Sequence, residues 1–92
     1  MGIGTPITKL LHGSATWDAG SLVDGAGETK AVTVTGAVLG DFVLVSLNLD
    51  VQEMVVSAHV SADNTVEVRL QNETGGTIDL ASTTVNVVVI KL

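Results

Sequence analysis

The side chains that could do chemistry in this sequence are few, and their spacing fits no common catalytic or metal-binding motif. The two histidines, His12 and His59, lie far apart, and neither belongs to an HxH or HExxH sequence that would place two imidazoles on one metal ion. Ser57 and Ser61 flank His59 at alternate positions, which is typical of the polar face of one strand. No G-x-S-x-G sequence supplies a nucleophilic serine. We therefore expect no enzymatic activity and no bound metal.

Carboxylates and glycines likewise indicate turns rather than ligand sites. An aspartate in a turn usually accepts hydrogen bonds from nearby backbone. No D-x-[DN]-x-[DN]-G calcium loop occurs, although calcium held between subunits stays an alternative. The glycine-containing segments 25–27 and 75–76 precede no Lys-Ser or Lys-Thr that would complete a phosphate-binding loop. The Asn-Glu-Thr sequence at 72–74 matches the glycosylation motif, which we interpret as coincidental because no secretory signal is evident. The sequence predicts no cofactor.

The charge and cysteine content exclude several classes of protein. The 92 residues carry a formal net charge of −6 with only four basic side chains, so the clustered positive charge needed to bind nucleic acid or an anionic membrane is missing. Without cysteine, the chain cannot be a disulfide-stapled domain or a thiolate zinc module. No apolar run approaches the roughly 20 residues needed to span a membrane. We expect neither nucleic acid nor a membrane as a partner.

The apolar residues are of the kind that favours strands. Valine and threonine dominate, only 2% of the residues are aromatic, and ten glycines interrupt the apolar runs. Because β-branched side chains fit a pleated surface better than a helix, the composition predicts an all-β protein. The pattern predicts a small antiparallel β-sandwich or barrel of six to seven short strands with an N-terminal arm. The expected strands are 14–19, 28–35, 42–48, 54–61, 65–72, 83–92 and, as a short strand or link, 77–80, with 20–27 as a turn.

Two of these segments are unusually apolar. The segment 42–48 (FVLVSLN) is nearly continuous in its hydrophobicity, which predicts a strand buried on both faces or one at an interface. The valine-rich segment 83–92 would be prone to aggregation at a sheet edge. A domain this small and apolar is expected to cover such surfaces with copies of itself or with a host scaffold.

Residues 1–13 are expected to form an arm, and residues 14–92 a single β domain. The arm carries several aliphatic residues, so it is either a frayed terminus or a segment that docks on a neighbouring subunit. Trp17, the one tryptophan, is either an aromatic anchor at that contact or a core residue. The candidate contact residues are Ile3, Pro6, Ile7, Leu10, Leu11 and Trp17.

Three blocks of the sequence resemble small β-domain virion proteins of tailed bacteriophages. They are T-G-A-x-L-G-D at 35–41, V-S-A-D-N-T-V at 60–66 and N-x-T-G-G-T-I-D-L-A-S at 72–82. The resemblance covers roughly residues 14–92 and leaves the arm outside. It implies a virion structural protein without catalytic residues or a cofactor.

Among such proteins, a short chain with an apolar arm is most similar to a head decoration, or cement, protein. The resemblance then implies a homotrimer on the outer capsid surface of the virion, made in the bacterial host cytoplasm, with the major capsid protein as partner. The arm residues would contact the capsid or a neighbouring subunit. The alternative is a tail, collar or fibre-associated β-module for attachment or receptor binding, and a more distant one is a small carbohydrate-binding or lytic domain.

Overall fold

The computed structural model describes residues 6–92, and all regular structure in this range is β-strand, as the composition predicts. Eight strands follow one another: β1 (Lys9–Trp17), β2 (Gly20–Leu22), β3 (Gly27–Thr33), β4 (Phe42–Leu47), β5 (Val55–Ala62), β6 (Thr65–Gln71), β7 (Ile78–Leu80) and β8 (Thr83–Lys91). Every pairing is antiparallel.

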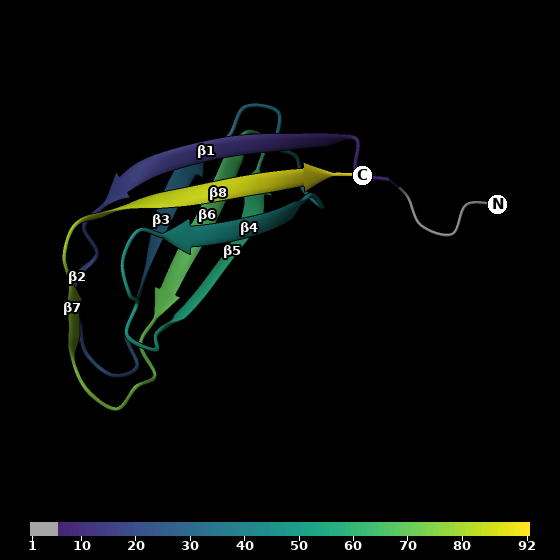
Figure 1. The fold of residues 1–92 in the computed structure, drawn as a ribbon. Helices are drawn as coiled ribbons and strands as arrows, with labels where there is room; N and C mark the ends of the chain where they lie inside the picture. Colours follow the sequence, from purple (N-terminus) through teal and green to yellow (C-terminus); the bar gives the residue numbers. More distant parts are fainter. Residues whose placement is uncertain (1–5) are drawn as a thin grey trace.

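The strands form two three-stranded sheets and one short pair. The β8 sheet has the order β1-β8-β4, the β6 sheet has the order β3-β6-β5, and β2 pairs with β7. Figure 1 shows the β8 sheet lying across the β6 sheet, with the β2-β7 pair at the end away from the C-terminus. The predicted antiparallel sandwich is therefore confirmed, with one strand more than expected.

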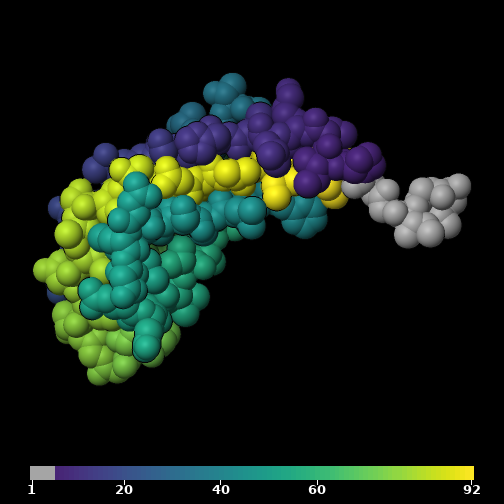
Figure 2. Space-filling model, viewed as in Figure 1, coloured from purple at the N-terminus to yellow at the C-terminus, as the bar shows by residue number. Residues whose placement is uncertain are grey.

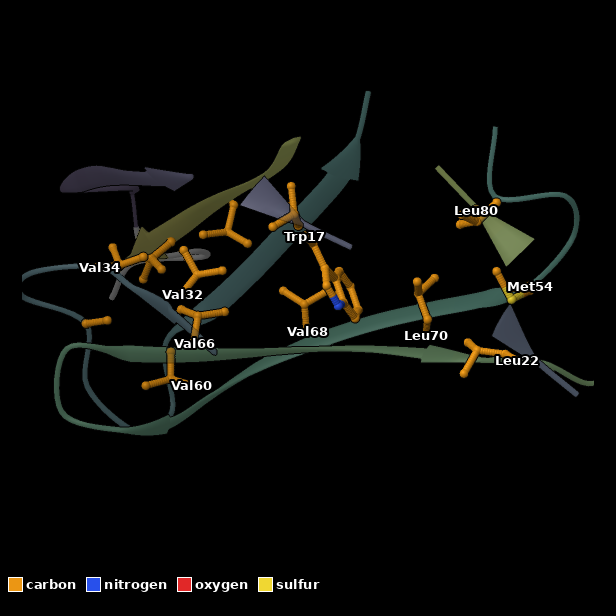
Figure 3. Packing of buried hydrophobic residues seen from close by; sticks show 14 of the residues in the cluster. Trp17, Leu22, Val32, Val34, Met54, Val60, Val66, Val68, Leu70 and Leu80 are labelled. Carbon is orange, nitrogen blue, oxygen red and sulfur yellow. The ribbon is translucent and has the colours of Figure 1, made fainter. Parts of the chain in front are cut away.

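The two central strands supply the middle of the core. Val85, Val87 and Val89 of β8 are fully buried, and so are the inward residues of β6, Val66, Val68 and Leu70. Because successive side chains of a strand point to opposite faces, every second residue of each strand enters the same core. Trp17 joins this cluster (Figure 3) with only 4% of its surface exposed.

Three sequence-based expectations differ from the structure. The first strand begins at Lys9, so residues 9–13 pair with β8 and do not form a separate arm. The segment 20–27 contains β2, because Leu22 is buried and its strand pairs with β7. The segment 42–48 is not buried on both faces, because β4 lies at an edge and exposes Phe42 and Leu44. The last strand, β8, lies at the centre of its sheet, so the valine-rich segment 83–92 is not left at an edge.

The connection between β3 and β4 is fastened to the β5–β6 hairpin by one asparagine. Asn64 adopts a φ of 62°, in the left-handed region that asparagine tolerates better than most residues. Its backbone N–H donates to the Ala37 carbonyl (2.8 Å), and its side-chain Oδ1 accepts from the Gly36 N–H (2.7 Å). The hairpin turn therefore holds the segment that leads into β4, the exposed edge strand.

Gly13 allows β1 to pack closely on the end of β3. A Cβ atom at this position would lie 2.7 Å from Val34 Cγ2 and 2.9 Å from the Thr33 carbonyl oxygen. Since the second of these atoms belongs to the backbone, no rotation of a side chain relieves the clash. The edge strand β1 therefore depends on a glycine for its distance from the β6 sheet.

We predict that Gly13→Ala lowers the free energy of unfolding by about 1–3 kcal/mol, the usual cost of overpacking a filled interior. Urea unfolding followed by the fluorescence of Trp17 measures this loss. Gly76→Ala is the matched control, because a Cβ there meets no atom within 4 Å, and we expect its stability to change by less than about 0.5 kcal/mol. If Gly13→Ala were as stable as the control Gly76→Ala, β1 would have room to shift away from the end of β3.

Candidate interaction surface

The outer face of the β8 sheet carries apolar side chains that no other described element covers. The strand register places Leu10, Ile90 and Phe42 in one row across the sheet and His12, Val88 and Leu44 in the next. Leu10, Phe42 and Leu44 are exposed by 62%, 59% and 62% respectively, whereas Val88 and Ile90 are half-buried by their neighbours. We call the five aliphatic and aromatic residues, Leu10, Phe42, Leu44, Val88 and Ile90, the apolar face.

The apolar face occupies the half of the sheet nearest the C-terminus. Figure 2 views the molecule from this side, with β1, β8 and β4 side by side on its surface. The next row toward the other half consists of Ser14, Asn86 and Ser46. Asn86 Nδ2 donates to Asn48 Oδ1 (3.0 Å), so polar contacts begin where the apolar rows end. The apolar face therefore has a defined border.

The outer face of the β6 sheet has the opposite character. Its central residues include Arg69, which donates to Thr29 Oγ1 (3.2 Å) and to Gln71 Oε1 (3.1 Å). The next row contains His59 and Glu67, whose Nε2 and Oε2 atoms lie 3.8 Å apart. Because the two outer faces belong to one thin sandwich, the molecule has one polar side and one side that is apolar over half its length.

The end of the sheet beside the apolar face is closed by an ion pair. Lys91 Nζ binds Asp41 Oδ2, and the same oxygen accepts the Val38 N–H (3.0 Å). The two interactions hold the turn before β4 against the end of β8. Four other exposed apolar side chains lie in this turn and near the two ends of the described chain: Ile7, Val38, Leu39 and Leu92. The remaining two, Val23 and Val55, are isolated, and Val55 lies on the otherwise polar outer face of the β6 sheet.

The structure separates the predicted contact residues into three groups. Pro6, Ile7 and Leu10 are exposed, and Leu10 belongs to the apolar face. Leu11 and Trp17 point to the core side of β1, with Leu11 half-buried against the core and Trp17 buried, so the core alternative applies to Trp17. Ile3 lies outside the described residues.

Sequence reasoning did not single out the other members of the apolar face. Phe42 and Leu44 lie in the segment 42–48, for which a strand at an interface was one of the two alternatives. They are exposed because this strand lies at the edge of its sheet, and the sequence pattern does not reveal an edge position. The sequence does contain an indication for Val88 and Ile90, because the 83–92 segment has apolar residues at both odd and even positions near its end. A strand with that pattern has two apolar faces.

Residues 6–92 show neither an enclosed pocket nor a cluster of metal-ligating side chains. No three His, Asp or Glu side chains in this range gather where they could hold a metal ion. Within the same range, no helix has the length and hydrophobicity to cross a membrane. Comparison with protein-family models, with curated proteins and with solved structures found no match to this chain.

The Asn-Glu-Thr motif at 72–74 has a structural role. Asn72 is fully buried, and its Nδ2 donates to the carbonyl oxygens of Leu22 (2.7 Å) and Gly76 (2.8 Å). Its Oδ1 accepts from the Thr74 N–H (3.0 Å) and the Thr74 hydroxyl (2.7 Å). Because both amide hydrogens are engaged, the side chain is not available for glycosylation in the folded protein.

We predict that Asn72→Asp lowers the free energy of unfolding by about 2–4 kcal/mol, because a carboxylate faces two carbonyl oxygens to which it cannot donate. Urea unfolding at pH 7 checks this value. Asn86→Asp is the control, since the Asn86 amide makes its hydrogen bond at the surface, and a change within about 0.5 kcal/mol is expected. A similar loss in both variants would mean that the effect comes from added negative charge.

The ion pair at the end of the sheet predicts a pH dependence. The hydrogen bond from Lys91, together with the one from the Val38 N–H, lowers the pKa of Asp41 below its usual value of 3.8. A carboxylate with a lowered folded-state pKa stabilises the protein above the unfolded pKa, and this stabilisation disappears as the pH falls through the folded-state pKa. Asp41→Asn should therefore be less stable than the wild type at pH 7, and the difference should shrink below about pH 4.

Thermal unfolding from pH 7 to pH 2, followed by circular dichroism, measures this difference. Asp18→Asn is the matched control, because Asp18 is exposed and has no ion-pair partner within residues 6–92. A gap between Asp41→Asn and the wild type that stays constant with pH would contradict the prediction.

Proposed function

We propose that this protein is a capsid decoration, or cement, protein of a tailed bacteriophage. It binds the major capsid protein on the outer surface of the assembled shell and has no enzymatic activity and no cofactor. The observation that carries the proposal is the apolar face, because a protein that acts alone rarely leaves a contiguous apolar surface open. The resemblance of the three sequence blocks to phage virion proteins supplies the kind of partner.

The two faces of the sandwich suit a position on a shell. The apolar face would lie against the capsid, and the polar outer face of the β6 sheet would point to solvent. The block at 35–41 ends at Asp41, which forms an ion pair with Lys91. Asp41 directly precedes β4, the strand that carries Phe42 and Leu44. This block therefore orients the edge strand that contributes two of the five residues of the apolar face.

The proposed mechanism is stabilisation by mass action. A protein that binds the assembled shell but not its separated subunits shifts the equilibrium toward the shell. Each contact contributes a modest free energy, and many copies acting on one particle make the total large. Self-association is part of the proposal, and the homotrimer that the resemblance implies is one arrangement in which several copies would engage the shell together.

We predict that Leu10→Lys weakens binding to shells at least tenfold, because a lysine charge would have to be desolvated against an apolar partner. The purified protein is mixed with capsids of the phage that encodes it, after the capsids have been stripped of their own copies of the protein. Co-sedimentation then measures binding. Thr29→Lys adds the same charge to the polar outer face and should bind like the wild type. Deletion of residues 1–13 is a poorer test, because it removes the first half of β1.

Equal binding of Leu10→Lys and the wild type would reject the apolar face as the capsid contact. The number of copies per virion tests the location independently. Hundreds of copies fit decoration of the head, whereas a handful would favour the alternative of a tail, collar or fibre-associated module.

A further inference from the structure

We propose that the free edge of β4 pairs with β4 of a second copy of this chain, so that two β8 sheets join into one continuous antiparallel sheet. The inference deepens the self-association in the proposed function by naming its partner, its strand and its geometry. It rests on the edge of the sheet and not on the apolar face.

The strand β4 has one edge with no strand paired to it. It lies at the end of the β1-β8-β4 sheet, and within residues 6–92 its one strand partner is β8. The N–H and C=O groups on its other side have no hydrogen-bond partner within residues 6–92. The strand β5 approaches from the other sheet but forms no ladder with β4. Such a row of donors and acceptors is a template for one more strand.

The strand β4 also lacks the features that normally protect an edge strand from pairing. Natural edge strands carry charged residues, inward-pointing charges, proline or bulges. Of the other edges of the two main sheets, β1 has Lys9, β3 has Glu28 and Lys30 on the side facing the core, and β5 has a register shift at Val60/Ala62. The six residues of β4 (FVLVSL) include no charge, no proline, no glycine and no bulge. This edge alone is left suited to pairing.

A second β4 is a matching partner for this edge. The chain carries a net charge of −6, so two copies repel each other overall, but the β4 strands themselves bring no charge into the contact. Paired residues must point to the same face of a sheet. A two-fold axis at Leu44 meets this condition and places Phe42 opposite Ser46 of the second copy and Val43 opposite Val45. It also covers Leu44, which is 62% exposed in one copy, with its own equivalent.

This geometry joins copies in pairs. A two-fold contact uses the same strand from both molecules and is closed once made. The β1 edge is not an equivalent partner, because it carries Lys9 and His12. We therefore expect a dimer of the isolated protein, in place of the homotrimer that the resemblance implies.

The test uses two leucines with the same exposure on the same face. Leu44 and Leu10 are both 62% exposed, but Leu44 lies on β4 and Leu10 on the opposite edge strand, β1. Sedimentation velocity of the full chain should show a dimer for the wild type and for Leu10→Lys. Leu44→Lys places two like charges opposite each other and should weaken the dimer at least tenfold. Circular dichroism and Trp17 fluorescence confirm that each variant is folded.

A second measurement fixes the register. The chain has no cysteine, so a disulfide can form only between introduced ones. Residues directly opposite each other in an antiparallel pair have Cα atoms about 4.5–5.5 Å apart, within the range of about 4.4–6.8 Å that a disulfide spans. Leu44→Cys should therefore give a covalent dimer under mild oxidation, and Leu10→Cys should not.

The outcomes separate this proposal from its alternatives. A wild-type monomer at about 100 μM, well above the dissociation constant of a weak specific pair, would overturn it, and so would a trimer. Dissociation by Leu10→Lys as well as by Leu44→Lys would indicate face-to-face packing and also reject edge pairing. Neither of these two measurements contains a capsid. Absence of the dimer would therefore not count against the proposed binding to shells, and absence of binding to shells would not count against the dimer.

Discussion

The rest of the molecule depends on β8, which is hydrogen-bonded along both edges, apolar on its core face and, near its C-terminal end, apolar on its outer face as well. Val85, Val87 and Val89 fill the core on one side of it, and Val88 and Ile90 lie on the other. In a strand that is buried on one face only, apolar residues on the buried face normally alternate with polar residues on the other face. Since β8 keeps its second face apolar near its end, that surface must either be covered by something other than residues 6–92 or be left in water.

The polar interactions of the fold act mainly on connections rather than on strands. Asn72 binds the carbonyls of Leu22 and Gly76 and so links the ends of β2 and β6 to the turn before β7. Asn64 and the Asp41–Lys91 pair do the same for the segment leading into β4. A small core contributes only a few kcal/mol of net stability. These four well-placed polar side chains therefore have a large share in deciding where the edge strands lie.

The local sequence pattern was sufficient to predict the strands whose residues alternate between the core and solvent. The strict alternation of the β6 segment predicted an inward row, and Val66, Val68 and Leu70 form it. Pattern was insufficient where the answer depends on pairing between distant segments. The segment of β4 reads as buried on both faces, and only its position at the end of β1-β8-β4 exposes Phe42 and Leu44. β2 was missed because its three residues become a strand only through β7, more than fifty residues later.

The edge and the apolar face are adjacent, and their combination has a consequence for function. When two β4 strands pair about Leu44, the row of His12, Val88 and Leu44 continues into the same row of the second copy, so the two apolar faces meet along this row. The dimer then presents two such faces in a fixed relative orientation. Two linked contacts bind a repeating surface more tightly than one, provided that their spacing matches the repeat. A shell built from identical subunits is such a surface, and edge pairing would give weak single contacts the geometry to act together.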